Sequence, residues 1–314
     1  MKVISAIILF FVFTASGCQA QKTEPVKPAD SSKIENTQTK QASELEKQIT
    51  EIAAAARGRV GVKTEVLETG ESVSLLAGEK FPMQSVYKLP IGMAVLRRVD
   101  EGKLKLDEKI RVEKSEYAAR GMLSPLRDEN PNGAEVTVAE LLRLAVSVSD
   151  GTASDVLMRL ASGASAVQSF LGEIKVGEIM VVNPEKDFSA DWQTQYRNWA
   201  TPAGAVELLR AVHEKRGLSA ESNALLMKLL TETKTKPNRL KGLLPKDAIV
   251  AHKTGSSGSR EGITAATNDI GIINLPNGKH LAIAVFVSDS PADEKTREAV
   301  IAKIAKAAWD KWSK

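Results

Sequence analysis

Ser85-Val86-Tyr87-Lys88 is the stretch of this chain that does most to decide its fold and chemistry. It is the one place among the 314 residues where a serine precedes a lysine by three positions. On a helix, residues i and i+3 share a face, so we expect the Lys88 amine to reach the Ser85 hydroxyl. A neighbouring base makes a serine hydroxyl nucleophilic, and a helix beginning at Ser85 would favour the anionic oxygen through its dipole. An ordinary surface helix gives the same spacing, so the remaining sequence has to decide.

The composition argues against nucleic-acid binding and zinc chemistry. The chain has 43 basic and 39 acidic residues and only 4% aromatic residues, without a basic stripe, so no nucleic-acid partner is expected. The three histidines, His213, His252 and His280, are scattered without metal-ligand spacing, which disfavours a zinc hydrolase. We therefore expect no metal and no organic cofactor. The length suffices for one large core or two joined sub-domains.

The N-terminus predicts export. Residues 1–20 resemble a signal peptide, with an apolar run from Val3 to Phe13 that is too short to span a membrane comfortably. Cys18 is the only cysteine, which excludes a disulfide within the chain, and its context resembles a lipobox in which the thiol is lipidated. Cleavage after Ala20 would instead release a soluble protein. We favour the lipoprotein; both alternatives place the protein outside the cytoplasm, in the periplasm. Residues 21–42 are polar and predict a flexible tether.

The remaining sequence predicts a sheet that is interrupted by a long helical block. Alternating apolar residues bounded by turn residues indicate strands, whereas the pattern from Ser85 to about Leu230 is helical. The expected strands cover residues 60–66, 71–77, 248–254, 269–275 and 281–287. Helix caps are expected at Ser43, Thr137 and Thr201, and an amphipathic helix closes the chain. This order predicts an α/β sub-domain of residues 43–82 and 243–314 and an all-α sub-domain of residues 83–242, with a ligand cleft at their junction.

Two further motifs are placed where they could line that cleft. Ser149-Asp150-Gly151 follows a helix predicted from Val138 to Val146, and Lys253-Thr254-Gly255 ends a predicted strand. Together with Ser85 and Lys88, these motifs resemble the set found in penicillin-recognising serine enzymes.

A fourth element narrows the resemblance to class A serine β-lactamases. In that class a glutamate lies on an omega loop between the second and third motifs, and Glu185 occupies this place, 36 residues after Ser149 and 68 before Lys253. The stretches at 195–199, 238–245 and 267–269 are most similar to the PER- and VEB-type extended-spectrum branch. The resemblance implies an α/β fold: an antiparallel sheet flanked by N- and C-terminal helices, an inserted all-α domain, and an omega loop at about 183–198.

The resemblance also implies catalytic roles. Ser85 would attack the lactam carbonyl, with Lys88 as base or proton relay; Glu185 acting through a water is the alternative base. Ser149 would pass a proton to the departing nitrogen, with Lys253 nearby. Two lysines in one site lower each other's pKa, which would help Lys88 exist as a free amine. Glu185 would then activate the water that hydrolyses the acyl-enzyme.

Backbone N–H groups of Ser85 and Ser256 are expected to form the oxyanion hole. The substrate carboxylate requires hydroxyl donors and a cation, and Arg239 offers a guanidinium suited to it. For Arg239 a solvated loop charge is the open alternative, and Arg260 is a rival for the same role. The implied substrate-binding residues are Thr254, Gly255, Ser256, Arg239, Gly151 and Ser189.

The sequence departs from the family pattern in three places. Gly151 stands where an asparagine is usual, which removes an amide that would contact the substrate, so we expect weaker binding and altered inhibitor response. Ser189 stands where an asparagine usually helps to hold the water. Asn183 and Asn198 replace the arginine–aspartate bridge of the omega loop, and an amide pair could close the loop without charge assistance.

Other functions fit the sequence less well. A D,D-peptidase would lack the deacylating Glu185, a β-lactam sensor would need transmembrane signalling segments, and a non-catalytic scaffold would not need the intact motifs. We therefore expect a secreted or lipid-anchored class A serine β-lactamase that is a monomer, acts on small-molecule β-lactams and prefers cephalosporins.

Overall fold

The computed structural model describes residues 43–189 and 191–314, which belong to one compact unit, Thr39–Lys314. The predicted signal peptide, the tether and Cys18 lie outside the described residues. Within the described part, no helix combines the length and apolar character needed to cross a membrane.

An antiparallel sheet joins strands from the two ends of the chain, in the order β2-β1-β11-β10-β8, with β9 paired to β10. Its strands are β1 (Arg59–Val66), β2 (Ser72–Leu75), β8 (Val250–Ser256), β9 (Ser259–Arg260), β10 (Ile263–Asn274) and β11 (His280–Ser290). The N-terminal hairpin joins the C-terminal strands through β1 and β11, where Val60 lies opposite Val287. The predicted antiparallel sheet is confirmed, and β10 begins at Ile263 rather than Asp269.

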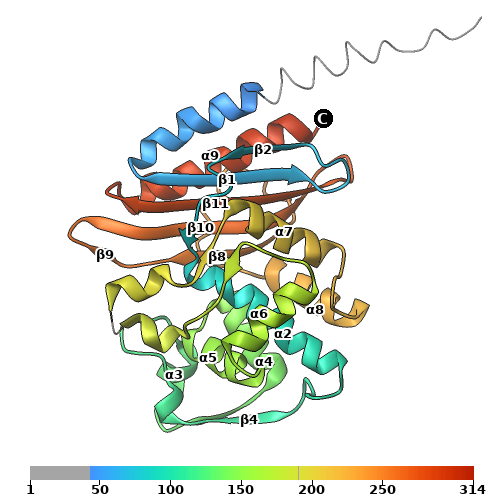
Figure 1. Ribbon diagram of the computed structural model, residues 1–314, viewed down its shortest axis with the longest axis vertical. Coiled ribbons are helices and arrows are strands. Elements are labelled where there is room, and N and C mark those ends of the chain that lie inside the picture. Colours follow the sequence, from blue (N-terminus) through green and yellow to red (C-terminus); the bar gives the residue numbers. More distant parts are fainter. Residues whose placement is uncertain (1–42, 190) are drawn as a thin grey trace, which may run out of the picture. The chain divides into compact units, whose positions relative to one another are not determined.

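Helices from both chain ends cover one face of this sheet (Figure 1). They are the helix at residues 43–53, which continues as the 3₁₀ turn η1 (Ala54–Ala56), and α9 (Glu294–Trp312). An apolar core fills the space between, with Ile49, Val285 and Ile304 among its fully buried members. Because helices cover both faces, β10 and β11 are buried along nearly all their length.

The block between the strands packs against the other face of the sheet and encloses a second core (Figure 1). Its longer helices are α2 (Lys88–Asp100), α4 (Val138–Arg143), α5 (Gly151–Leu160), α6 (Ala164–Glu173), α7 (Pro202–His213) and α8 (Ala220–Thr231), with the short α3 (Pro125–Glu129). Thr137 and Thr201 cap α4 and α7 through their hydroxyls, as predicted.

The prediction that this block is all-α is wrong in detail. A two-stranded sheet pairs β4 (Lys109–Val112) with β5 (Ala134–Thr137), because alternate residues of β4 pack inward. A second small sheet joins β3 (Phe81–Pro82), β7 (Trp199–Ala200) and β6 (Ile179–Met180). It ties the segment before Ser85 to both ends of the omega loop. The sub-domain boundaries at 82/83 and 242/243 remain a prediction.

Candidate active site

A cleft of about 710 Å³ brings the three predicted motifs together with the omega loop. Ser85, Ser149, Glu185, Thr254 and Ser256 are among the residues that line it. Lys88 and Lys253 lie behind this lining and are 1% and 0% exposed. The hydroxyl-bearing residues Ser85 and Ser149 therefore face the cleft, whereas the two lysines are buried behind it.

Ser85 lies in a 3₁₀ turn, η2 (Gln84–Tyr87), that leads directly into α2. Its place in the first turn of this helical run lets the helix dipole favour negative charge on its oxygen. Gln84 has φ +49°, a left-handed conformation that non-glycine residues adopt mainly where the surrounding structure enforces it. The Gln84 amide donates a 2.7 Å hydrogen bond to Gln195 Oε1, so the omega loop fixes the residue before the nucleophile.

Lys88 connects two other parts of the site. Its Nζ donates to the Ser149 carbonyl oxygen at 2.8 Å and forms an ion pair with Glu185 Oε2 at 3.1 Å. Among the described residues, no hydrogen bond joins Lys88 to the Ser85 hydroxyl, although the two belong to the same helical turn. The predicted contact between Lys88 and Ser85 is absent because the Ser149 carbonyl and the Glu185 carboxylate both bind Lys88 Nζ.

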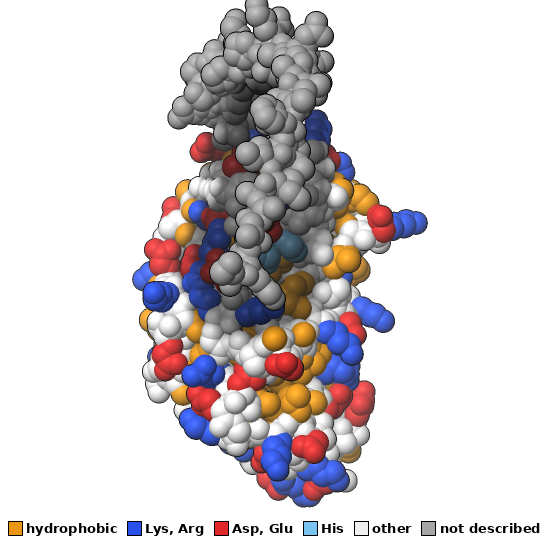
Figure 2. All heavy atoms as spheres, turned by 90° about the vertical axis from the view of Figure 1, so that its right-hand side faces the viewer, with side chains coloured by type: hydrophobic (Ala, Val, Ile, Leu, Met, Phe, Trp, Pro, Cys, Tyr) orange, Lys and Arg blue, Asp and Glu red, His pale blue; other side chains and the backbone are white. Residues whose placement is uncertain are grey.

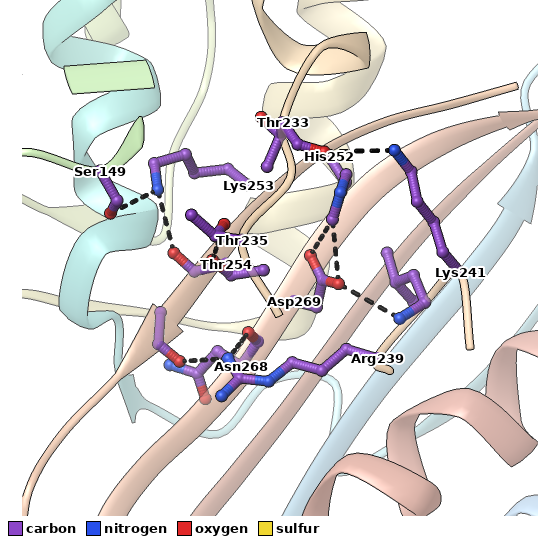
Figure 3. Close-up of polar contacts among 12 residues, drawn as sticks. Ser149, Thr233, Thr235, Arg239, Lys241, His252, Lys253, Thr254, Asn268 and Asp269 are labelled. Atoms are coloured by element: carbon purple, nitrogen blue, oxygen red, sulfur yellow. Dashed lines mark hydrogen bonds and ion pairs between the residues drawn. The ribbon is translucent and has the colours of Figure 1, made fainter. Parts of the chain in front are cut away.

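Ser149 is positioned by a break in helical geometry. The π-helical turn η4 (Leu144–Val148) ends at Ser149, which has φ 68° and ψ 28° in the left-handed region. Asp150 then caps α5 by accepting the Ala153 N–H, and it also accepts the Leu126 N–H at 2.7 Å. These bonds aim the Ser149 hydroxyl at Lys253, whose Nζ donates to it at 2.9 Å (Figure 3).

Lys253 has a pKa that its place in the site perturbs. Complete burial, together with the positive charge of Lys88, lowers the pKa of Lys253 well below its usual value. A buried amine with a lowered pKa can release or accept a proton near neutral pH, and this amine contacts the Ser149 hydroxyl.

The Glu185 carboxylate is held at one oxygen. Tyr87 Oη donates to Glu185 Oε2 at 2.6 Å, and Lys88 contacts the same atom. Oε1 carries no hydrogen bond among the described residues, and Glu185 lines the cleft. Burial and the charge of Glu185 raise the pKa of Tyr87 well above its usual value, so its hydroxyl remains a donor. One carboxylate oxygen is thus anchored and the other is available to a water.

Asp155 fixes the backbone of the same loop. Its two carboxylate oxygens accept the N–H groups of Glu185 at 2.6 Å and Lys186 at 3.0 Å. Burial, with a contribution from the Glu185 charge, raises the pKa of Asp155 to about 6, against the opposing effect of these two N–H donors. An internal carboxylate from α5 therefore sets where the omega loop presents Glu185.

At Gly151, where the sequence lacks the usual asparagine amide, the space that a side chain would need is already occupied. A Cβ at Gly151 would lie 2.9 Å from Glu185 Cγ and 3.1 Å from Ala118 Cβ. The Glu185 side chain therefore packs where an asparagine side chain would begin. The side chain of Ser189 lies outside the described residues.

One asparagine closes the omega loop through the main chain. The Asn198 carboxamide accepts the N–H groups of Val182 and Asn183 at 2.8 and 2.9 Å and donates to the Asn183 carbonyl at 2.8 Å. The Asn183 side chain instead donates to Asp187. The expected amide pair is therefore an amide-to-backbone clamp.

The cleft wall formed by β8 is held from behind by Arg239 (Figure 3). Its Nη1 donates at 2.9 Å to the carbonyl oxygens of Gly255 and Asn268, and its Nη2 donates to Ser256 Oγ at 2.8 Å. Nε pairs with Glu298 Oε1 at 3.2 Å. Because Arg239 is 1% exposed, a solvated loop charge is wrong, and its guanidinium reaches the cleft only through Ser256.

Arg260, the rival cation, does not line the cleft. It lies in β9 with a side chain that is 60% exposed, and its nearest acidic partner is Glu261 at 3.8 Å. On the substrate side, the Thr254 and Thr235 hydroxyls are 2.7 Å apart, and Ser256 is exposed. Hydroxyl groups rather than a guanidinium therefore form this part of the surface.

The predicted oxyanion-hole residues are brought together by a close backbone approach. A Cβ at Gly255 would lie 2.4 Å from the Met83 carbonyl oxygen, so only glycine lets β8 pack on η2 here. The Asn268 amide donates to the Pro82 and Met83 carbonyls at 2.8 and 3.1 Å. Ser85 and Ser256 consequently line the same cleft from opposite sides of this contact.

Sequence reasoning missed three positioning residues: Tyr87, Asp155 and Asn268. Tyr87 lies inside the first motif, but nothing in the neighbouring sequence indicates that its hydrogen-bond partner is 98 residues away. Asp155 lies in α5, six residues after Ser149. Its partners are backbone N–H groups, which nearly every residue has, so the sequence does not indicate this contact.

The fold and this site are those of a class A serine β-lactamase. The model of the Beta-lactamase enzyme family matches residues 44–312. The chain is 39% identical to beta-lactamase VEB-1 of Pseudomonas aeruginosa over 86% of this chain and 91% of that protein. It is 42% identical to extended-spectrum beta-lactamase PER-1 of Pseudomonas aeruginosa over 84% of this chain and 86% of that protein.

Solved structures agree. A beta-lactamase from Chitinophaga pinensis superposes with a TM-score of 0.83 at 44% identity, covering 85% of this chain and 98% of that one. TLA-1 extended-spectrum beta-lactamase gives 0.84 at 40% identity, covering 87% and 99%. The chain therefore belongs to the beta-lactamase enzyme family, as a class A β-lactamase of the PER/VEB type.

Proposed function

We propose that this β-lactamase hydrolyses its substrates through an acyl-enzyme on Ser85 and prefers cephalosporins. The observation that carries the proposal is the convergence of Ser85, Ser149 and Glu185 on one cleft, with Lys88 and Lys253 linking them from behind.

In acylation, Ser85 Oγ bonds to the lactam carbonyl carbon and gives up its proton, and the carbonyl oxygen becomes an anion facing the backbone N–H groups of Ser85 and Ser256. Lys88 as a free amine, or Glu185 through a water, takes this proton, and their 3.1 Å contact lets either pass it to the other. As the C–N bond breaks, Ser149 gives its hydroxyl proton to the lactam nitrogen, and Lys253, which donates to Ser149 Oγ, replaces it. The proton taken from Ser85 then returns to Lys253 by way of water, so Glu185 is again a carboxylate before deacylation.

In deacylation, a water attacks the ester carbon while Glu185 takes one of its protons. The C–O bond to Ser85 then breaks, and the proton that Glu185 took from the water passes through Lys88 to Ser85 Oγ, which restores both the hydroxyl and the carboxylate. Glu185 is suited to this step because Tyr87 and Lys88 occupy Oε2 and leave Oε1 for the water. A general base positioned in this way typically accelerates a reaction by about 10²–10⁴-fold.

The cephalosporin preference draws on the printed descriptions of the relatives, which include extended-spectrum enzymes. The cleft supports it through hydroxyl groups at Thr254, Ser256 and Ser257 that can bind a substrate carboxylate. Arg239 polarises the Ser256 hydroxyl from behind.

Steady-state hydrolysis of a chromogenic cephalosporin and of a penicillin tests this proposal. Wild type should turn over many equivalents of both, with the higher kcat/KM for the cephalosporin. Ser85→Ala should abolish turnover, whereas Ser115→Ala, which changes an exposed serine outside the cleft, should keep it. A single stoichiometric burst in the wild type would instead identify a penicillin-binding peptidase or a sensor.

We also propose that the protein is an exported monomer, with lipid attached at Cys18. Fractionation of cells that produce wild type or Cys18→Ala tests the anchor. Lipidation predicts wild type in the membrane fraction and the variant in the soluble periplasmic fraction, both sedimenting as monomers after extraction. Equal soluble distribution of the two would contradict it.

A further inference from the structure

Two of the three histidines converge with a glutamate on the surface, far apart in sequence. Glu68 follows β1 in the turn toward β2, His213 is the last residue of α7, and His280 is the first residue of β11. One ligand-type atom from each lies within 4.8 Å of those of the other two. Histidine surface is visible on the face drawn in Figure 2. The scattered spacing in the sequence conceals this cluster.

The three side chains are arranged around a common point. His280 Nδ1 is 2.6 Å from Glu68 Oε1, and the backbone N–H of His280 donates to Glu68 Oε2 at 2.9 Å. His213 Nε2 is 3.8 Å from the same Oε1 atom. The imidazole rings are 4.6 Å apart between centroids.

His213 is the member whose position is otherwise unexplained. Among the described residues, its ring makes no hydrogen bond, yet it is held against a second imidazole and a carboxylate. Imidazole nitrogens beside a carboxylate oxygen are the ligands that bind a zinc-like cation.

We propose that Glu68, His213 and His280 form a surface site for a divalent transition-metal ion of the Zn²⁺ class. Bonds of about 2.0–2.1 Å in tetrahedral geometry place ligand atoms about 3.3 Å apart. The observed separations of 2.6 and 3.8 Å lie on either side of that value, so small side-chain rotations suffice. The side chains are about one-third exposed, which leaves a fourth position for water.

The neighbouring charges do not oppose a cation. Arg210, one turn earlier in α7, is paired with Glu65 and Glu214, so its charge is offset by two carboxylates.

A metal ion at this site would cross-link three segments of the fold. It joins the β1–β2 turn, the end of α7 and the start of β11, and none of its three residues lines the catalytic cleft. Because the ligands come together only in the folded chain, the metal binds the native state and raises its stability. β-Lactam hydrolysis should not require the metal.

Thermal unfolding of an untagged, chelator-treated protein tests the proposal, in a Cys18→Ala background that removes the thiol as a ligand. At a Zn²⁺ concentration about 100 times Kd, Tm should rise by about 5 °C. Mg²⁺ at the same concentration should give no shift. His213→Gln, which removes no hydrogen bond, should fold normally and lose the Zn²⁺ effect.

Co²⁺ provides a second measurement that reports the ligands directly. One equivalent should produce the visible absorption of a tetrahedral nitrogen and oxygen site, absent in His213→Gln and in His280→Ala. If Zn²⁺ leaves Tm unchanged, or if His213→Gln keeps the same shift and the same Co²⁺ spectrum, the proposed site does not exist.

Discussion

Tyr87 Oη lies 2.6 Å from Glu185 Oε2, so a residue inside the Ser-x-x-Lys turn anchors the carboxylate of the omega loop. Both residues are buried, and the Tyr87 ring packs edge-on against Phe188 with centroids 5.8 Å apart. The nucleophile turn and the carboxylate proposed for deacylation are therefore a single hydrogen-bonded unit. Several consequences of this unit are open to measurement.

Tyr87→Phe should slow deacylation. The hydroxyl holds Glu185 Oε2 at 2.6 Å, and a hydrogen bond to a charged group typically contributes about 1.5–3 kcal/mol, so its loss frees the carboxylate to move. The single-turnover deacylation rate should fall, while the ring keeps its packing on Phe188. Tyr117→Phe, which removes a hydroxyl bonded to the Asn130 carbonyl, should leave this rate unchanged. Equal deacylation rates for wild type and Tyr87→Phe would refute this role.

Gly151→Asn should impair deacylation instead of restoring a contact. The new Cβ would lie 2.9 Å from Glu185 Cγ, so the carboxylate has to move. A displacement of this kind typically costs up to about 100-fold in rate. Gly151→Ala is the matched control, because it adds the same Cβ without the amide. Pre-steady-state rates should show both variants slowed in deacylation; a slow asparagine variant beside a normal alanine variant would mean that the amide matters and the crowding does not.

Arg239→Ala should weaken both the fold and substrate binding. It leaves Glu298 buried without its partner, a loss typically worth about 3–5 kcal/mol, and it frees Ser256. We expect a lower Tm and a lower kcat/KM for carboxylated substrates. Arg260→Ala removes an exposed charge and should change neither quantity. The reverse pattern in the two variants would show that Arg260 provides the cation.

The raised pKa of Asp155 predicts a particular pH dependence of stability. Its native-state pKa of about 6 exceeds the unfolded value of about 3.9, so the native state holds more protons between these pH values. The free energy of unfolding should therefore fall as pH rises through this window, by up to about 3 kcal/mol. Asp155→Asn lacks this titration. Denaturant unfolding at pH 4 and pH 7 should show the wild type losing stability relative to the variant, and parallel profiles would contradict the burial of the charge.

The motifs can be recognised from the sequence alone because their chemistry requires fixed residue types at fixed spacing. Ser85, Ser149, Glu185 and Lys253 could be named in this way, and alternation of apolar residues indicated every strand of the main sheet except the short β9. Contacts between distant segments could not be read. The Tyr87 bond spans 98 residues, and Asp155 and Asn198 bind backbone groups that any sequence would provide.

Two residues could not be placed from the sequence for a common physical reason. For Arg239 a substrate-binding guanidinium and a solvated loop charge both stayed open, and at Gly151 only the absence of an asparagine side chain could be recognised, because burial is a property of the folded chain. In the structure Arg239 is enclosed by β8, β10 and α9, and Gly151 makes room for Glu185. In each case a long-range packing partner decides what the residue does.

The most direct measurement is the intact mass of Glu185→Gln after mixing with a cephalosporin. We expect this variant to be acylated and to accumulate one covalent adduct, which the double variant with Ser85→Ala does not form, while wild type returns to its free mass as substrate is consumed. An unmodified Glu185→Gln protein with undiminished turnover would show that Glu185 is not the deacylating base.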